Sequence, residues 1–274
     1  MRFRGILKKW LYGNCPGFTG SFPYCGTQVY FPKGSKIFEL TCNQGIYELD
    51  NILLLEALVE SNSICFDVGA NIGLMALPIL QHNKSCKVVS FEPSPNTLQF
   101  LNRTVTNSQF THRWSVVDKA LGSEVGELDF YLSSSALGAF DGFRDTQRVR
   151  VTEKITVPVT TLDIEWEAIG KPFVSVIKID VEGAELDVLK GALSCIYNQQ
   201  PSILLEWNAT NLKAYNCQPE VLLDFAEKLE YQVFSVPDLL LIPNPTILKL
   251  KMLKTESFLM ASRKTSRRLI LPTP

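Results

Sequence analysis

The sequence predicts an α/β protein with a mostly parallel β-sheet covered by helices on both faces. Apolar runs of strand length alternate with helical patterns from about residue 63 onward, which is typical of successive βαβ units. With 274 residues, the chain can bury a sizeable core. Its residues are 46% hydrophobic and 20% charged, a composition that favours a globular domain over a disordered chain.

The main domain is expected to open with a helix and to continue as alternating strands and helices. Residues 46–60 have broad helical periodicity. Another helix has Ser94 as its predicted N-cap and Pro95 at its first position. We predict strands at 63–68, 87–91, 113–118, 174–180 and 202–207, and helices at 71–82, 95–107 and 185–194.

Two later segments depart from the parallel pattern. Residues 126–132 and 148–159 alternate apolar and polar side chains, which predicts antiparallel strands inserted between the third and fourth parallel strands. Between them, residues 133–147 are small, polar and glycine-bearing, as expected of a mobile loop that covers a site. After residue 230, the segments YQVFSV and LKLKMLK are predicted to be the final strands.

We expect three segments along the chain: an N-terminal arm (1–44), the main domain (45–250) and a basic extension (251–274). The arm is expected to contain extended pieces at TQVYF and KIFELTC and to pack over one edge of the domain. The extension is expected to be a solvated, frayed terminus, with contact to an acidic partner or anionic lipid as the alternative. Four of its basic residues crowd near its end: Arg263, Lys264, Arg267 and Arg268.

Charge and cysteine content narrow the possible partners and the location. The formal net charge of −1 gives no sign of a nucleic-acid partner. Seven cysteines without a CxxC pair are typical of reduced thiols in a cytoplasmic protein and do not predict a zinc site. No apolar run reaches the roughly 18 residues of a membrane span, so we expect a soluble chain. The sequence does not determine the oligomeric state.

The segment FDVGANIG follows the first predicted parallel strand. Asp67 lies at the end of that strand, and Gly69, Ala70, Asn71 and Gly73 follow it. Gly69 permits a tight turn, and Gly73 lets the next helix approach the strand closely. Ligands of open parallel sheets bind at the carboxyl ends of the strands, so this turn is a candidate ligand site.

The residues around the turn favour S-adenosylmethionine over a dinucleotide. Glu92 follows the second strand at the distance expected of an acid that binds ribose hydroxyls. A dinucleotide fingerprint needs a glycine where Asn71 stands, because the pyrophosphate passes there. Asp67 would repel a phosphate but attract the ammonium group of a methionine moiety.

The third strand ends in another acid, Asp118. We expect it to reach the adenine amino group, with Lys119 and Ala120 beside it. Asp67 and Glu92 could instead be a helix-terminal charge and a surface acid. Acids at three successive strand ends argue against that alternative.

With FDVGANIG, FEPSP, VVDKALG and IKIDVEGAE in this order, residues 45–235 resemble the FkbM family of S-adenosylmethionine-dependent methyltransferases. The resemblance implies a Rossmann-like class I methyltransferase fold with a seven-stranded sheet, and methyl transfer to hydroxyl oxygens of sugars or polyketides. It implies that the glycine turn contacts the methionine portion, Glu92 the ribose and Asp118 the adenine end. It also places Asp180, Glu182 and Glu185 beside the transferred methyl.

Transfer to a hydroxyl needs a base or a metal ion, because the oxygen must lose its proton. In one hypothesis Asp180 or Glu182 is the general base and Glu206 orients the acceptor. In the other, Asp180, Glu206 and Asn208 bind Mg²⁺. We favour the metal-free hypothesis, because acids beside a helix N-terminus are stabilised without a metal.

Other unusual residues are expected to have structural roles. His82 and His112 are predicted far from the strand carboxyl ends, so neither is a candidate base. Lys178, inside an apolar strand, is interpreted as a residue that extends its ammonium group to solvent. Trp166 and Trp207 could stack on an acceptor but are more typical of a core.

The function predicted first is therefore an O-methyltransferase for a small-molecule or glycan acceptor. The alternative from another class is a non-catalytic adenosyl-binding module that serves a partner protein. A dinucleotide-dependent oxidoreductase is disfavoured by the glycine spacing.

Overall fold

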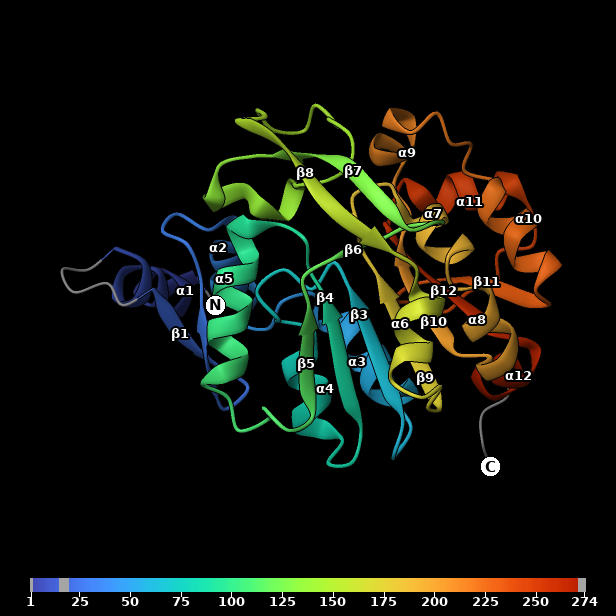
Figure 1. Cartoon of the computed structure of the whole chain (residues 1–274), viewed down its shortest axis with the longest axis horizontal. Helices are drawn as coiled ribbons and strands as arrows, with labels where there is room; N and C mark the ends of the chain where they lie inside the picture. Colours follow the sequence, from blue (N-terminus) through green and yellow to red (C-terminus); the bar gives the residue numbers. More distant parts are fainter. Residues whose placement is uncertain (1, 15–19, 271–274) are drawn as a thin grey trace.

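The computed structural model describes residues 2–14 and 20–270, and it contains a seven-stranded sheet between layers of helices (Figure 1). The strands of this sheet are β3 (Ile64–Val68), β4 (Lys87–Phe91), β5 (Trp114–Val117), β9 (Val174–Ile179), β10 (Ser202–Glu206), β11 (Tyr231–Ser235) and β12 (Ser257–Ser262). Their order is β11-β12-β10-β9-β3-β4-β5. β12 runs antiparallel to both of its neighbours, β10 and β11, and the other strand pairs of this sheet are parallel. The predicted mostly parallel seven-stranded α/β sheet is confirmed.

The helices bury separate apolar cores on the two faces of the sheet. Side chains of α3, α4, α5 and the arm pack on one face, and those of α6 to α11 pack on the other. Along β3, Cys65 faces the first core and Phe66 the second, so both faces require apolar residues. The bounds are α3 Leu49–Leu58, α4 Ala76–His82, α5 Pro95–Thr106, α6 Leu162–Ala168, α7 Glu185–Lys190, α8 Leu193–Gln199, α9 Ala209–Ala214, α10 Val221–Lys228 and α11 Pro245–Met252.

A second sheet of three strands lies above the main sheet in Figure 1. It consists of β6 (Ala120–Leu121), β7 (Gly126–Leu132) and β8 (Glu153–Thr160), and β7 pairs antiparallel with β8 as predicted. The predicted loop between them contains a 3₁₀ helix, η2 (Ser135–Phe140), which contacts α5. This insertion therefore lies beside the carboxyl ends of the main strands.

The arm contains α1 (Arg2–Lys8), the π-helical segment η1 (Lys9–Asn14), β1 (Ser21–Tyr24), β2 (Thr27–Tyr30) and α2 (Lys36–Gln44). It packs against α5, beside edge strand β5, and the Tyr30 amide donates to Thr104 Oγ1 at 3.1 Å. The extended piece predicted at TQVYF is confirmed as β2. The one predicted at KIFELTC is wrong, because the Ser35 side chain caps α2 and Phe38 is buried at helical spacing. Cys15 lies outside the described residues.

The predicted end of the domain at residue 250 is also wrong. LKLKMLK is mostly helical, because Asn244 caps α11 and Pro245 occupies its first turn. The last strand is β12, which lies between β10 and β11. The helix α12 (Arg263–Ile270) follows, in place of the frayed terminus that was predicted. No helix among residues 2–14 and 20–270 is long and apolar enough to cross a bilayer.

Two other predicted helices differ in their bounds. The helix predicted at 71–82 begins only at Ala76, because the preceding residues form the glycine turn. The helix predicted at 185–194 is interrupted at Gly191, where a Cβ would lie 2.0 Å from the Gly122 carbonyl oxygen. Both differences arise where two backbone segments pack closely, and hydrophobic periodicity does not predict such packing.

Candidate active site

A cavity of about 270 Å³ lies at the carboxyl ends of the central strands. Its volume is close to the lower end of the roughly 300–1,000 Å³ found for ligand pockets. Most of the predicted site residues line it: Gly69, Ala70, Asn71, Glu92, Lys119, Ala120, Asp180, Glu182 and Glu206. Residues from α2 and from the η2 insertion complete the wall.

Three predicted donor-site residues do not line the cavity. Asp67 is buried behind the turn, with 1% of its surface exposed. Gly73 has a φ of 89°, and a Cβ there would lie 2.7 Å from the Trp114 ring, so it serves packing. Asp118 is exposed to solvent. The structure does not bring Asp118 to the pocket wall.

The glycine turn is fixed by its neighbours. Gly69 has a φ of 75°, and a Cβ there would lie 1.8 Å from the Asp180 carbonyl oxygen, so no larger residue fits. Glu92 accepts from the Asn71 amide and from the Ser94 amide, each at 2.8 Å. Burial raises the pKa of Glu92 to about 7. Its carboxylate still has lone pairs for a ligand.

Lys178 is buried between the turn and the acidic end of the cavity. Its Nζ donates to the Gly69 carbonyl oxygen at 2.9 Å and lies 3.5 Å from Asp67 Oδ1 and 3.5 Å from Asp180 Oδ2. Burial lowers the pKa of Lys178, but the charges of Asp180 and Asp67 outweigh it and raise this pKa above its usual value. With only 6% of the residue exposed, the interpretation that Lys178 extends to solvent is wrong.

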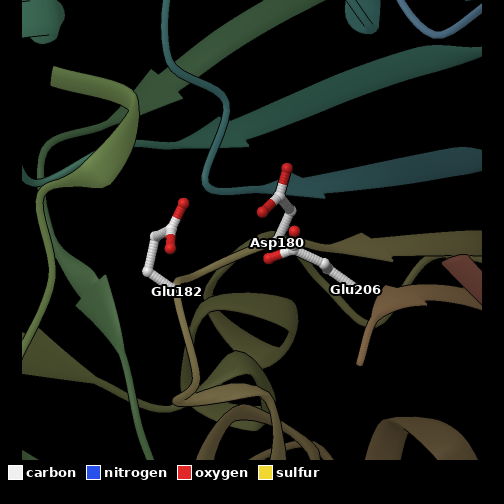
Figure 2. A group of neighbouring side chains, drawn as sticks. All are labelled: Asp180, Glu182 and Glu206. Atoms are coloured by element: carbon white, nitrogen blue, oxygen red, sulfur yellow. The ribbon is translucent and has the colours of Figure 1, made fainter. Parts of the chain in front are cut away.

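Three carboxylates lie together at the ends of β9 and β10 (Figure 2). Asp180, Glu182 and Glu206 each place one oxygen within 4.8 Å of the others. Glu182 accepts from Arg148 at 2.8 Å and from the Asn211 amide group at 2.9 Å. These donors hold Glu182 in one orientation toward the cavity.

Glu206 accepts a hydrogen bond from the same Asn211 side chain as Glu182. It accepts from Asn211 Nδ2 at 3.2 Å and from Asn208 Nδ2 at 3.3 Å. The Asn208 side-chain oxygen caps α9 by accepting from the Asn211 backbone amide at 2.9 Å. Asn208 does not line the cavity, whereas Asp180, Glu182 and Glu206 form a group of carboxylates that could hold a metal ion.

The cluster holds protons tightly. Burial, with the negative charge of Asp180, raises the pKa of Glu182 to about 8. The same two causes raise the pKa of Glu206 well above its usual value. Neighbouring carboxylates cannot all ionise at low cost. The cluster can therefore accept and donate protons near neutral pH.

Glu185, which the resemblance placed beside the transferred methyl, has a structural role. Its carboxylate accepts from the Val181 amide at 3.1 Å and from the Gly183 amide at 3.0 Å. It is 1% exposed and does not line the cavity. These contacts fix the turn that presents Glu182, whose φ is 57°.

Several residues of the cavity wall were not predicted from the sequence. Glu48 precedes α3 and Glu256 precedes β12, and both line the cavity. Glu256 reaches this edge because β12 is antiparallel, with Ser257 paired to Glu206. Neither residue carried a signal in the sequence, because Glu48 lies within the helix predicted at 46–60 and no strand was predicted after Glu256.

Asp141, in the insertion, was also missed. It accepts from the Ser133 amide at 2.7 Å, from Ser94 Oγ at 2.6 Å and from Asn96 Nδ2 at 3.2 Å. These bonds tie the η2 segment to the start of α5. The sequence around Asp141 predicts only a turn.

The histidines and tryptophans lie where the sequence placed them. Neither His82 nor His112 lines the cavity. Trp207 donates to the Pro219 carbonyl oxygen at 3.0 Å, and both Trp207 and Trp166 are core residues, at most 2% exposed. The six described cysteines are free, and Cys65, Cys86 and Cys195 are buried, as expected of small core residues.

Known proteins share parts of this chain. The family description "Methyltransferase FkbM domain" matches residues 67–233. The hexuronic acid methyltransferase AglP of Haloferax volcanii is 31% identical over 150 residues, which cover 54% of this chain and 58% of that protein. The 2-O-methyltransferase NoeI of Sinorhizobium fredii is 26% identical over 150 residues, which cover 50% of this chain and 60% of that protein.

The chain spans about three fifths of the length of these two curated relatives. Among solved structures, a crystal structure of methyltransferase FkbM from Methylobacillus flagellatus KT is 21% identical, with a TM-score of 0.49. That alignment covers 82% of this chain and 52% of the other.

Proposed function

Because the chain belongs to the FkbM family of methyltransferases, we propose that it transfers a methyl group from S-adenosylmethionine to a hydroxyl of a sugar, glycan or polyketide-like small molecule. One observation carries the proposal: a single cavity is lined by both the glycine turn and the three carboxylates. The name of one relative, a hexuronic acid methyltransferase, supports a sugar acceptor, and the name of the other, a 2-O-methyltransferase, supports transfer to an oxygen atom.

The residues of the turn fit this donor. Gly69 lets the turn lie directly against the Asp180 backbone, and the buried acid Glu92, which follows the second strand, lines the same cavity. We assign Gly69, Ala70 and Asn71 to the methionine portion and Glu92 to the ribose. Lys119 and Ala120 would lie at the adenine end. When bound, S-adenosylmethionine supplies an electrophilic methyl group on its sulfonium.

Of the three carboxylates, we assign Glu182 as the general base. A base is most effective when its pKa is near the working pH, and the pKa of Glu182 is raised to about 8 by burial and by Asp180. Arg148 and Asn211 hold Glu182 in place. Glu206, whose pKa burial and Asp180 raise well above its usual value, keeps its proton and donates a hydrogen bond to the acceptor.

The proposed mechanism uses no metal ion. Asn208, one of the three ligands that the magnesium hypothesis requires, does not line the cavity, and its side-chain oxygen caps α9. A chelator should therefore leave the initial rate of methyl transfer unchanged. A rate that falls with chelator and returns with added Mg²⁺ would support the metal hypothesis instead.

The test is a transfer assay with S-adenosylmethionine and a panel of uronic acids, neutral sugars, amino sugars and polyketide alcohols, measured as S-adenosylhomocysteine formed. Glu182→Gln should lower kcat by about 100-fold or more and leave S-adenosylhomocysteine affinity unchanged. The matched control is Glu127→Gln, an exposed acid on β7. Donor binding without transfer to any acceptor would support the alternative of a non-catalytic adenosyl-binding module. A cytoplasmic location remains a prediction.

A further inference from the structure

The N-terminal arm has an exposed apolar surface. Ile6 is 64% exposed, Leu7 46%, Trp10 56% and Leu11 42%. Leu7, Trp10 and Leu11 follow Ile6 by one, four and five positions. This spacing places the four side chains on one side of the helical segment formed by α1 and η1. We call these four side chains the arm face. Apolar side chains that gather on an exposed surface mark a contact with a protein or a membrane.

The opposite side of the same segment is already packed. A Cβ at Gly5 would lie 2.8 Å from the Cys42 carbonyl oxygen, and a Cβ at Gly13 would lie 2.9 Å from the Phe38 ring. Lys9 also forms an ion pair with Glu39 at 2.8 Å. These contacts fix the segment on α2. Leu7 and Leu11 also line a small cavity beside Phe22 and Phe38, but all four side chains of the arm face keep at least 42% of their surface exposed.

The charge of the arm indicates what covers this face. The first acidic residue of the chain is Glu39, and six basic residues precede it: Arg2, Arg4, Lys8, Lys9, Lys33 and Lys36. Lys8 is exposed beside the arm face. A short helical segment that combines basic residues with exposed tryptophan, leucine and isoleucine is typical of proteins that lie in the interface of an anionic membrane.

We propose that the arm face binds the surface of a bilayer that contains anionic lipid. Ile6, Leu7, Trp10 and Leu11 enter the boundary between headgroups and acyl chains, and Lys8 lies against the lipid phosphates. The segment lies in the plane of the membrane. Because α2 supports the arm and also contributes Lys36, Ile37 and Leu40 to the cavity wall, the membrane contact lies one helix away from the candidate active site. The proposal rests on the arm and does not depend on methyl transfer.

Trp10 is a selective reporter for the test. The chain has four tryptophans, and Trp114, Trp166 and Trp207 are at most 2% exposed. The full chain is titrated with vesicles of phosphatidylcholine alone or mixed with phosphatidylglycerol. With the mixed vesicles we expect a blue shift of the emission and quenching by brominated lipid. High salt should weaken this binding, because it screens the charges.

Three variants make the test specific. Lys8→Gln should weaken binding to the mixed vesicles about fivefold, as expected for the loss of one basic residue at an anionic surface. Ile6→Ser should weaken it about tenfold, because an apolar side chain leaves the membrane. Tyr197→Ser, at a position 78% exposed on α8, should not change binding. Far-ultraviolet circular dichroism checks that each variant is folded.

Two results would overturn the proposal. One is a Trp10 emission that does not change with mixed vesicles, or that changes equally with neutral ones. The other is shielding of Trp10 from acrylamide that increases with protein concentration when no lipid is present, since this would assign the arm face to a second copy of the chain.

Discussion

At the scale of single residues, Lys178 joins the two halves of the candidate site. Its ammonium lies 3.5 Å from Asp67 Oδ1 and 3.5 Å from Asp180 Oδ2, and it donates to the Gly69 carbonyl oxygen. Asp67 therefore acts on the turn through Lys178, and Asp180 receives a counter-charge. The sequence shows a polar residue within an apolar strand, but it does not show that strand pairing places Lys178 opposite Asp67.

Replacing Lys178 tests this role. Lys178→Met leaves the buried Asp67 without a counter-charge, so the free energy of unfolding should fall by about 3–5 kcal/mol. Lys178→Arg keeps the charge and should retain more of the stability. The control is Lys154→Met, which removes an exposed ion pair with Asp129 and should change the free energy of unfolding little, because solvent screens that pair. Denaturant unfolding measures all three, and equal stabilities of Lys178→Met and the wild type would contradict the assigned role.

The raised carboxylate pKa values predict how stability depends on pH. Burial and Asp180 raise the pKa of Glu182 to about 8 in the folded protein, whereas an unfolded glutamate titrates near about 4.3. Between these values the folded state binds a proton that the unfolded chain does not, so the free energy of unfolding should fall as pH rises. The slope from one such group approaches about 1.4 kcal/mol per pH unit.

Burial raises the pKa values of Glu92 and Glu185 to about 7. Below pH 7 these two groups also make the free energy of unfolding fall as pH rises. Glu182→Gln cannot ionise, so it should remove the contribution of Glu182 to the slope over the whole interval from about pH 5 to pH 8. Unfolding curves collected from pH 5 to 8.5 measure this. A wild-type stability that rises with pH across that interval would contradict these protonation states.

At the scale of elements, the sequence predicts best where one physical cause dominates. The central strands were predicted because burial on both faces makes them largely apolar, as in β9, where every residue is buried and only Ser175 and Lys178 are polar. The strand predicted at LKLKMLK is wrong because leucine and lysine can also alternate on a helix that buries a single residue, here Leu248. Several site residues lie at the carboxyl end of a strand or directly after it, so their convergence was predictable. They are the residues of the glycine turn, Glu92, Asp180, Glu182 and Glu206. Asp141 and Glu256 reach the site through an insertion and an antiparallel strand, which leave no motif.

The η2 insertion gives a prediction at this scale. Asp141→Ala removes the acceptor of the Ser133 amide and of Ser94 Oγ, which should cost about 1–3 kcal/mol locally. Hydrogen exchange of the amides in residues 133–142 should therefore accelerate. Asp145→Ala, at an exposed position of the same insertion, is the control. Unchanged exchange in Asp141→Ala would show that the insertion is held by other contacts.

At the scale of the whole molecule, the sheet depends on a strand beyond the domain end that the sequence predicted. Phe258, Leu259, Met260 and Ala261 of β12 are fully buried between β10 and β11. A chain that ends at residue 250 should therefore lose cooperative unfolding, measured by thermal melting. A chain that lacks only residues 271–274 should melt like the full chain. Cooperative melting of the shorter chain would contradict the assignment of β12 to the core of the sheet.

The central claim is that the cavity at the glycine turn binds an adenosyl donor and that the carboxylate cluster acts on the acceptor. Calorimetric titration of the full chain with S-adenosylhomocysteine, and separately with NADH, tests this claim most directly. We predict that only S-adenosylhomocysteine binds, that Glu92→Gln weakens it about tenfold or more through loss of charged hydrogen bonds, and that Glu182→Gln leaves it unchanged. Binding of NADH without binding of S-adenosylhomocysteine would contradict the account.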